Sequence, residues 1–360
     1  MKAGIITFQE TNNYGAVLQN YALQQAILKC GAEPETIDYL SDYIGRPYRL
    51  THLKNKGLLA YLYGIVGFLI YRMREKNTNF FRKHIRYSER IVRKQLATLN
   101  ERYAVFITGS DQVFNHRLTG GDATYLLDFV TDKKRCSSYA ASLGLENVGE
   151  AFCDAYKACL KDFRVISVRE KTASAALKEL LERDIAVVSD PCALLTCDEW
   201  RRVAVLPKER RAYVLVYELG ISPEVVSLAK QIASSENLKI LFVPFPLGIP
   251  AKGSWKPCAG PGELLGLIAQ AEYVITDSFH GTLLSIIFEK PFFTRIPEKR
   301  VGSRILDLLK EYGLEDRLIG SCIDYKKAID YRAVREKIAQ NRTYSMELLK
   351  KCVSEERTSK

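Results

Sequence analysis

A five-residue turn, 277–281, joins two apolar segments of the chain. The run before it has the length and composition of a buried strand, and the run after it reads as a buried helix. His280 is the only one of four histidines that lies between two apolar elements. A helix N-terminus favours anions, and an imidazole there could donate a proton or a hydrogen bond. We therefore predict a phosphate-binding site, with a buried structural histidine as the alternative. The predicted site contains Ser278, His280 and Gly281.

The segment 9–15 follows the first predicted strand, 3–8, and precedes a predicted helix at 16–29. Asn12, Asn13 and Gly15 could hold an anion or sugar hydroxyls at the start of that helix. The alternative is that Asn13 caps the helix and Gly15 serves the turn.

Two further strands are followed directly by polar residues. Gly109, Ser110 and Asp111 come after the run 104–108. The glycine would allow a ligand to approach closely. The two side chains could bind sugar hydroxyls, and Asp111 could accept a proton; the alternative is that it caps a helix. Arg169 directly follows the run 165–168, and its guanidinium could form two parallel hydrogen bonds with a carboxylate or phosphate. It could equally pair with Glu170 or a nearby aspartate.

Motifs for metal and nucleotide binding are missing from the sequence. There is no P-loop, no pair of aspartates separated by one residue, and no His/Glu pair with metalloprotease spacing. Nine cysteines are scattered without a C-x-x-C pair, which favours a reduced, cytoplasmic setting over a disulfide framework or a zinc site. The N-terminal residues lack the features of a signal peptide. We predict metal-independent chemistry without a cofactor.

The basic charge is confined to one segment. Residues 46–94 contain 13 basic and 2 acidic side chains, so they hold the whole net charge of +11. A general nucleic-acid-binding protein is therefore not indicated. Residues 57–71 carry no charge, and this run is too short to span a membrane. The segment 54–94 could place an interfacial helix on an anionic membrane, or pack as a buried helix with a solvated basic flank.

Short apolar runs alternate with amphipathic segments along the chain, which predicts α/β architecture with parallel sheets. A polar stretch at 206–211 separates two such series. We predict an N-terminal domain at 1–205 with an insert at about 40–100, a C-terminal domain at 206–330, and a helix within 331–360 that packs back on the first domain. Ligands of such sheets bind at the carboxyl ends of the strands, so the cleft between the domains is the expected site.

An ordered series of short motifs resembles the polysaccharide pyruvyl transferases. The motifs are TF at 7–8, NNYGAVLQ at 12–19, GSDQVFN at 109–115, YAASLG at 139–144, SVRE at 167–170, DP at 190–191, DSFHGT at 277–282 and KPF at 290–292. The resemblance extends from residue 3 to about 310. It covers the insert and the end of the chain poorly.

The resemblance implies two Rossmann-like domains facing a cleft, as in GT-B-like glycosyltransferases. It also implies transfer of pyruvate from phosphoenolpyruvate, as a cyclic ketal, to two hydroxyls of a surface polysaccharide or its lipid-linked precursor. By the same resemblance, Arg169 binds the donor, and His280 acts as an acid or phosphate ligand. Asp111 is our own candidate for handling the sugar hydroxyls.

One position departs from the family pattern. Members of the family have an arginine two residues before the histidine, and Ser278 takes that position here. Either Arg295 or Arg304 supplies the missing anion contact, or the donor differs. A nucleotide-sugar glycosyltransferase of GT-B-like fold and a non-catalytic glycan-binding protein therefore remain as alternatives. Stabilisation by phosphoenolpyruvate, by a nucleotide diphosphate, or by neither would separate the three.

Overall fold

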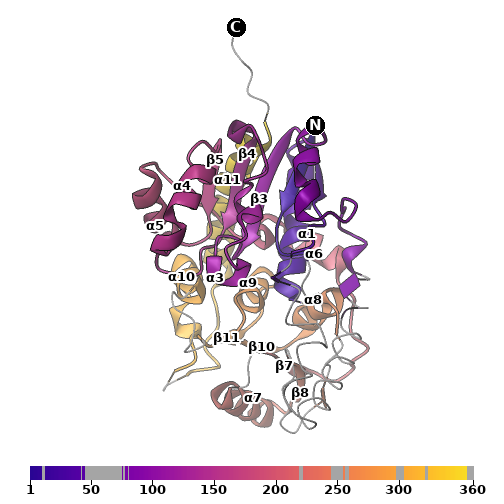
Figure 1. Cartoon of the computed structure of the whole chain (residues 1–360). Helices are drawn as coiled ribbons and strands as arrows, with labels where there is room; N and C mark the ends of the chain where they lie inside the picture. The colour runs from indigo at the N-terminus through magenta and orange to yellow at the C-terminus, as the bar shows by residue number, and fades with distance from the viewer. Residues whose placement is uncertain are drawn as a thin grey trace, which may run out of the picture. The chain divides into compact units, whose positions relative to one another are not determined.

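Two compact units make up the protein in a computed structural model of the whole chain (Figure 1). The first unit comprises 1–49, 82–195 and 339–360, and the second comprises 50–81 and 196–338. The structure describes residues 1–9, 13–41, 43–44, 75, 78–79, 81–218, 222–244, 254–255, 259–296, 304–320 and 323–354. Asn12 and the uncharged run 57–71 lie outside these residues, so their predicted roles remain predictions.

The first unit contains a parallel sheet of six strands in the order β2-β1-β3-β4-β5-β6. Its strands are β1 (Lys2–Ile6), β2 (Glu33–Thr36), β3 (Val105–Asp111), β4 (Cys136–Ala141), β5 (Val165–Val168) and β6 (Ala186–Val187). The central strands β3 and β4 are buried along their whole length, as expected for a parallel sheet with helices on both faces. Because all the strands are parallel, their carboxyl ends share one edge of the sheet.

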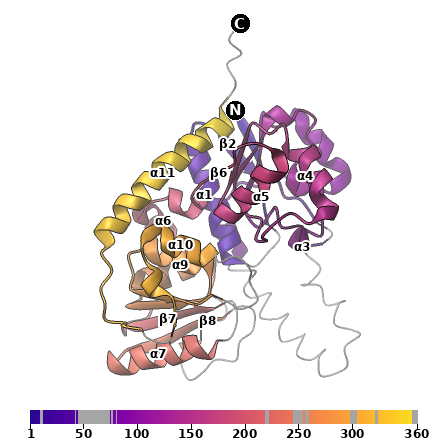
Figure 2. The same ribbon diagram turned by 90° about the vertical axis from the view of Figure 1, so that its left-hand side faces the viewer.

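Helices cover both faces of this first sheet (Figure 2). One face packs against α1 (Tyr14–Lys29) and the C-terminal part of α11 (Tyr331–Val353). The other face packs against α4 (Cys153–Leu160) and α5 (Lys171–Leu181). The shorter helices of this unit are η3 (Arg93–Glu101), α3 (His116–Thr119), η4 (Ala123–Leu126), η5 (Lys133–Arg135), η6 (Glu150–Phe152) and η7 (Pro191–Leu194).

The second unit contains a parallel sheet of five strands in the order β11-β10-β7-β8-β9. Its strands are β7 (Tyr213–Glu218), β8 (Lys239–Pro244), β9 (Ser254–Trp255), β10 (Tyr273–Thr276) and β11 (Phe292–Thr294). One face packs against α7 (Pro223–Ser235), and α9 (Phe279–Ile287) lies on β10 and β11. The remaining helices are α6 (Cys197–Val203), α8 (Pro261–Gln270), α10 (Arg304–Tyr312) and η8 (Glu315–Arg317).

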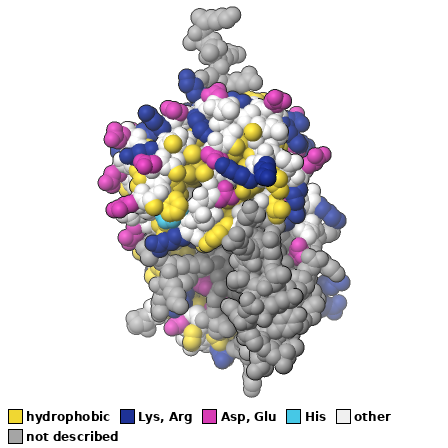
Figure 3. Space-filling view, viewed as in Figure 1, with side chains coloured by type: hydrophobic (Ala, Val, Ile, Leu, Met, Phe, Trp, Pro, Cys, Tyr) yellow, Lys and Arg dark blue, Asp and Glu magenta, His cyan; other side chains and the backbone are white. Residues whose placement is uncertain are grey.

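The α/β class and the parallel sheets predicted from the sequence are confirmed. The predicted strand 273–276 is present, and the predicted helix after it begins three residues earlier than expected, at Phe279, because Ser278 caps it. On the face drawn in Figure 3, basic and acidic side chains of the described residues are interspersed. Within the described ranges, no helix is both long and apolar enough to cross a membrane.

Candidate active site

Among the residues that the structure describes, four charged side chains meet at the carboxyl edge of the first sheet. They are Asp111, Arg169, Glu170 and Asp190, here called the carboxylate cluster. Arg169 Nη1 donates to Asp190 Oδ2 at 2.6 Å. Its Nη2 lies 4.0 Å from Asp111 Oδ1, and its Nε lies 4.0 Å from Glu170 Oε2. These residues follow or end β3, β5 and β6, so the parallel order of the sheet brings them together.

The guanidinium of Arg169 is nearly enclosed, with 3% of its side chain exposed. Burial lowers the pKa of Arg169, but the charges of Asp190, Glu170 and Asp111 outweigh burial and raise the pKa overall. Arg169 is therefore held as a cation by carboxylates, as the alternative sequence interpretation expected. The donor-binding role that the resemblance implies for it remains a prediction.

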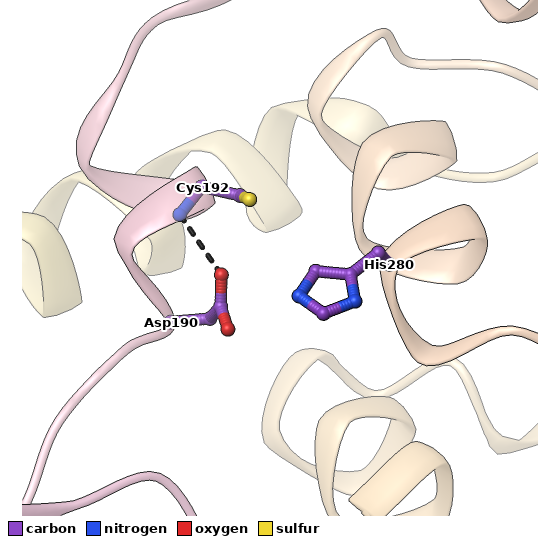
Figure 4. A group of neighbouring side chains, drawn as sticks. All are labelled: Asp190, Cys192 and His280. Carbon is purple, nitrogen blue, oxygen red and sulfur yellow. Dashed lines mark hydrogen bonds between the residues drawn. The ribbon is translucent and has the colours of Figure 1, made fainter. Parts of the chain in front are cut away.

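Asp190 is the partner that the sequence interpretation did not assign. Its Oδ2 also accepts a hydrogen bond from Ser110 Oγ at 3.2 Å, and its Oδ1 accepts the backbone N–H of Cys192 at 2.9 Å (Figure 4). In the sequence, only the Asp-Pro pair at 190–191 pointed to Asp190, and that pair does not indicate which side chain it contacts. The predicted residue Ser110 therefore lies in the cluster.

Asp111 has an unusual backbone conformation. Its φ of 67° places a non-glycine residue in the left-handed region, which costs about 1 kcal/mol or more. Ser142 N–H donates to its carbonyl at 2.8 Å, and Gln112 N–H donates to its Oδ1 at 2.9 Å. Strain of this kind is retained where the surrounding structure enforces it, often at functional sites. The alternative that Asp111 caps a helix is not what the structure shows, because the α3 cap is Asn115.

The structure shows a packing reason for Gly109. A Cβ at this position would lie 2.4 Å from Leu23 Cδ2 of α1. A side chain at position 109 would therefore displace Leu23 from the packing of α1 on the sheet. Close approach of a ligand to Gly109 remains a prediction.

At the start of α1, the structure shows the alternative interpretation, in which Asn13 caps the helix. Asn13 is the N-cap, and its side chain accepts the N–H of Gly15 at 2.9 Å. Both predicted residues are thus used by the helix start, and any additional contact with a ligand remains a prediction.

In the second unit, residues 277–281, here called the α9 turn, lead from the end of β10 into the first turn of α9, which begins at Phe279. Ser278 is the N-cap, and its Oγ accepts Gly281 N–H at 3.3 Å. This gives a structural reason for serine where the family pattern has arginine, since a short hydroxyl side chain caps a helix. His280 stands in the first turn of α9 (Figure 4) and is 7% exposed. Its ring packs edge-on against Phe279.

Gly281, which the sequence places in the predicted phosphate site, also has a packing role, and its contact with a ligand remains a prediction. A Cβ there would lie 2.5 Å from Thr276 Oγ1 and 2.9 Å from Tyr217 Cδ1. The absence of a side chain lets the first turn of α9 lie directly on β10 and β7.

Two arginines lie near the α9 turn, as the sequence interpretation allowed. The Arg304 guanidinium lies over the Phe279 ring, 5.8 Å from its centroid, within the range of a cation–π interaction. Arg295 follows β11, and its Nε lies 3.4 Å from Glu224 Oε2. Arg304 is therefore a cation that contacts the residue next to His280.

Glu218 was not singled out from the sequence. It ends β7 beside Asp277, because Tyr217 and Thr276 are paired in the sheet register. Burial, followed by the charge of Asp277, raises the pKa of Glu218 to about 8, against the N–H of Ser222 and the charge of Arg295. The carboxyl is therefore mostly protonated at neutral pH. Only the tertiary pairing of β7 with β10 creates this environment.

Replacing Glu218 with Gln should change how stability depends on pH. The folded-state pKa lies above the ordinary value of 4.5, so the native state binds an extra proton between these values. Wild-type stability should therefore fall, relative to the variant, as pH rises from about 5 to about 8. Relative to the variant, the wild-type protein should lose about 2 kcal/mol of unfolding free energy between pH 6 and 9. This loss is smaller than the upper limit of about 1.4 kcal/mol per pH unit, because Glu218 keeps some solvent contact.

Urea unfolding at several pH values measures this difference. Glu236→Gln is the matched control, because Glu236 is exposed on the same unit. A pH-independent difference between wild type and Glu218→Gln would contradict the assignment.

The sequence of this chain matches a known family over most of its length. A family model described as polysaccharide pyruvyl transferase matches residues 13–295. The chain belongs to the polysaccharide pyruvyl transferase family. The family inferred from the motifs is thus confirmed, and the match contains both the carboxylate cluster and the α9 turn. No curated protein matches the chain significantly.

Solved structures similar to this member of the polysaccharide pyruvyl transferase family have low sequence identity to it. UDP-GlcNAc 2-epimerase from Methanocaldococcus jannaschii is 14% identical, with a TM-score of 0.45, covering 94% of this chain and 92% of that chain. The E. coli heptosyltransferase WaaC with ADP-2-deoxy-2-fluoro heptose is 11% identical, with a TM-score of 0.42, covering 95% and 100%.

Proposed function

We propose that this protein transfers pyruvate from phosphoenolpyruvate, as a ketal, to two hydroxyls of a sugar in a surface polysaccharide or its lipid-linked precursor. The family match over residues 13–295 is the observation that carries the proposal. The reaction needs a site for a phosphorylated anion, an acid for the methylene carbon of the donor, and groups that accept the hydroxyl protons.

The donor phosphate is assigned to the α9 turn. The helix dipole of α9 favours an anion at this end. Arg304, stacked over Phe279, supplies a positive charge beside His280. These features offset the absence of an arginine at Ser278. His280 is placed as the acid or the phosphate ligand.

The sugar hydroxyls are assigned to the carboxylate cluster. Asp111 is buried, Ser142 N–H donates to its carbonyl, and Gln112 N–H donates to its side-chain Oδ1. A carboxylate held in this way can accept a hydrogen bond from a hydroxyl and then its proton. No cofactor or metal ion enters the proposal.

Phosphoenolpyruvate should raise the melting temperature of the wild-type protein, because a ligand that binds only the folded state stabilises it. At about 100 times its dissociation constant, the gain is about 2.7 kcal/mol. Differential scanning fluorimetry with phosphoenolpyruvate, UDP and ADP makes the comparison, with inorganic sulfate as the ionic control. Stabilisation by a nucleotide diphosphate alone would favour a nucleotide-sugar glycosyltransferase. Stabilisation by none of them would favour a non-catalytic glycan-binding protein.

A further inference from the structure

Glu170 uses its two carboxylate oxygens differently. Its Oε1 accepts three hydrogen bonds, from Ser142 Oγ at 2.7 Å, Leu143 N–H at 2.9 Å and Gly144 N–H at 3.1 Å. These bonds hold the loop that follows β4. Because Ser142 N–H donates to the Asp111 carbonyl, the same loop supports the left-handed backbone of Asp111. Oε1 therefore has a structural role.

The other oxygen, Oε2, is buried and has no hydrogen-bond partner among the residues that the structure describes. The side chain of Glu170 is 3% exposed, and Oε2 is 4.0 Å from Arg169 Nε, beyond hydrogen-bond distance. An ionised oxygen left in this state is costly, and most buried polar atoms in proteins have a partner. The geometry indicates that a donor group belongs beside Oε2.

The charge around Oε2 decides which kind of group that is. The carboxylate cluster has three acidic side chains and one arginine, a formal charge of −2. A further anion would be repelled there, whereas a neutral hydroxyl donor would be attracted. Asp111 Oδ1 and Glu170 Oε2 lie at equal distances, 4.0 Å, from the Arg169 guanidinium. Two carboxylates are thus held on a common cation.

We infer that Glu170 and Asp111 form a carboxylate pair that receives the two hydroxyls of the acceptor sugar, one on each residue. This inference rests on the proposed function, which requires two hydroxyls to lose their protons. It adds Glu170 as a catalytic residue and places the two acceptor hydroxyls, each as a hydrogen-bond donor, on separate carboxylates.

The reaction releases one proton from each of two hydroxyls, so two carboxylates can each accept one of them. The π electrons of the donor form a C–H bond at the methylene carbon when the acid delivers its proton. The first sugar oxygen then bonds to the adjacent carbon, and its proton passes to one carboxylate. The C–O bond to phosphate breaks with its electron pair, and the second sugar oxygen bonds to the same carbon as its proton passes to the other carboxylate. One of the two protons restores the acid, and the other leaves with hydrogen phosphate.

Glu170→Gln tests the pair, and Ser142→Ala is its matched control. In Glu170→Gln, the amide oxygen can still accept the three loop hydrogen bonds, but the other end of the side chain can no longer accept a hydroxyl proton. Ser142→Ala weakens the loop anchor and leaves Oε2 unchanged. With a panel of methyl glycosides as acceptors, we expect Glu170→Gln to lower kcat/KM for the acceptor by about 100-fold or more. We expect Ser142→Ala to lower it by less than about 10-fold.

Further measurements separate this inference from the proposed function. Calorimetry should give Glu170→Gln and wild type the same affinity for phosphoenolpyruvate, and the KM for phosphoenolpyruvate should likewise be unchanged. Saturation-transfer NMR should show glycoside binding to wild type and its loss in Glu170→Gln, whichever donor is used.

Equal losses of activity in Glu170→Gln and Ser142→Ala would mean that Oε2 binds only a water molecule, and the inference would be wrong. Failure of wild type to bind any glycoside of the panel would also contradict it. Failure to bind phosphoenolpyruvate, with glycoside binding intact, would contradict the proposed function alone.

Discussion

Replacing Arg169 with alanine should lower the free energy of unfolding of the first unit by about 3–5 kcal/mol. The substitution leaves Asp190 without its 2.6 Å ion pair, and it removes the positive charge shared by Asp111 and Glu170. Removing one partner of a buried ion pair costs this much because the remaining charge stays desolvated. Here three carboxylates would lose one common cation.

Guanidinium unfolding followed by circular dichroism measures the loss, and hydrogen exchange locates it. Peptides from β3, β5 and β6 should exchange faster in the variant, because the cluster residues end or follow these strands. Arg117→Ala is the matched control, since Arg117 is exposed on the same unit, and it should change stability by less than about 0.5 kcal/mol. Arg169→Lys should fall between the two, because lysine keeps the charge but not the planar fork. Wild-type stability in Arg169→Ala would show that the carboxylates do not depend on this residue.

This expected instability changes how the donor-binding role of Arg169 can be tested. Loss of activity in Arg169→Ala would follow from a collapsed cluster as well as from a lost donor contact. The informative variant is Arg169→Lys at a temperature where it is folded. A rise in KM for phosphoenolpyruvate would support donor binding, whereas a rise confined to the acceptor KM would assign Arg169 to positioning Asp111 and Glu170.

Replacing His280 with alanine should lower phosphoenolpyruvate-dependent phosphate release by about 10²- to 10⁴-fold. His280 lies in the first turn of α9, where the helix dipole favours an anion. The size of the effect follows from removing either a proton donor or a phosphate ligand. The two roles differ in kinetics, because loss of the acid lowers kcat, whereas loss of a ligand that binds donor and transition state alike raises KM.

Phosphate release measured over a range of pH provides the test. His84→Ala is the matched control, since His84 is an exposed histidine that packs edge-on against Tyr21, and it should retain wild-type activity. His280→Gln separates packing from chemistry because it keeps a polar side chain of similar length. Full activity in His280→Ala would show that the α9 turn is not the active site.

The amino-acid order alone was sufficient to predict the class of fold and the family. Continuous apolar runs ending in polar residues predict buried parallel strands, and the positions of Asp111, Arg169 and His280 at strand ends follow from that pattern. Capping by Asn13, one of the two interpretations that the sequence left open, is also confirmed, because capping depends on the local order of residues. These features are local along the chain, so one sequence is enough to indicate them.

The partners of these side chains became defined only in the folded protein. Arg169 could have paired with any nearby acid, and the order β3-β4-β5-β6 selects Asp190, 21 residues further along the chain. The packing reasons for Gly109 and Gly281, and the raised pKa of Glu218, likewise depend on neighbours from other elements. Glu170 combines a feature that the sequence predicts with one that only the folded protein shows. Its place after β5 follows from the sequence, but the burial of Oε2 beside Arg169 arises only when the sheet forms, because strand order is set by packing between distant segments.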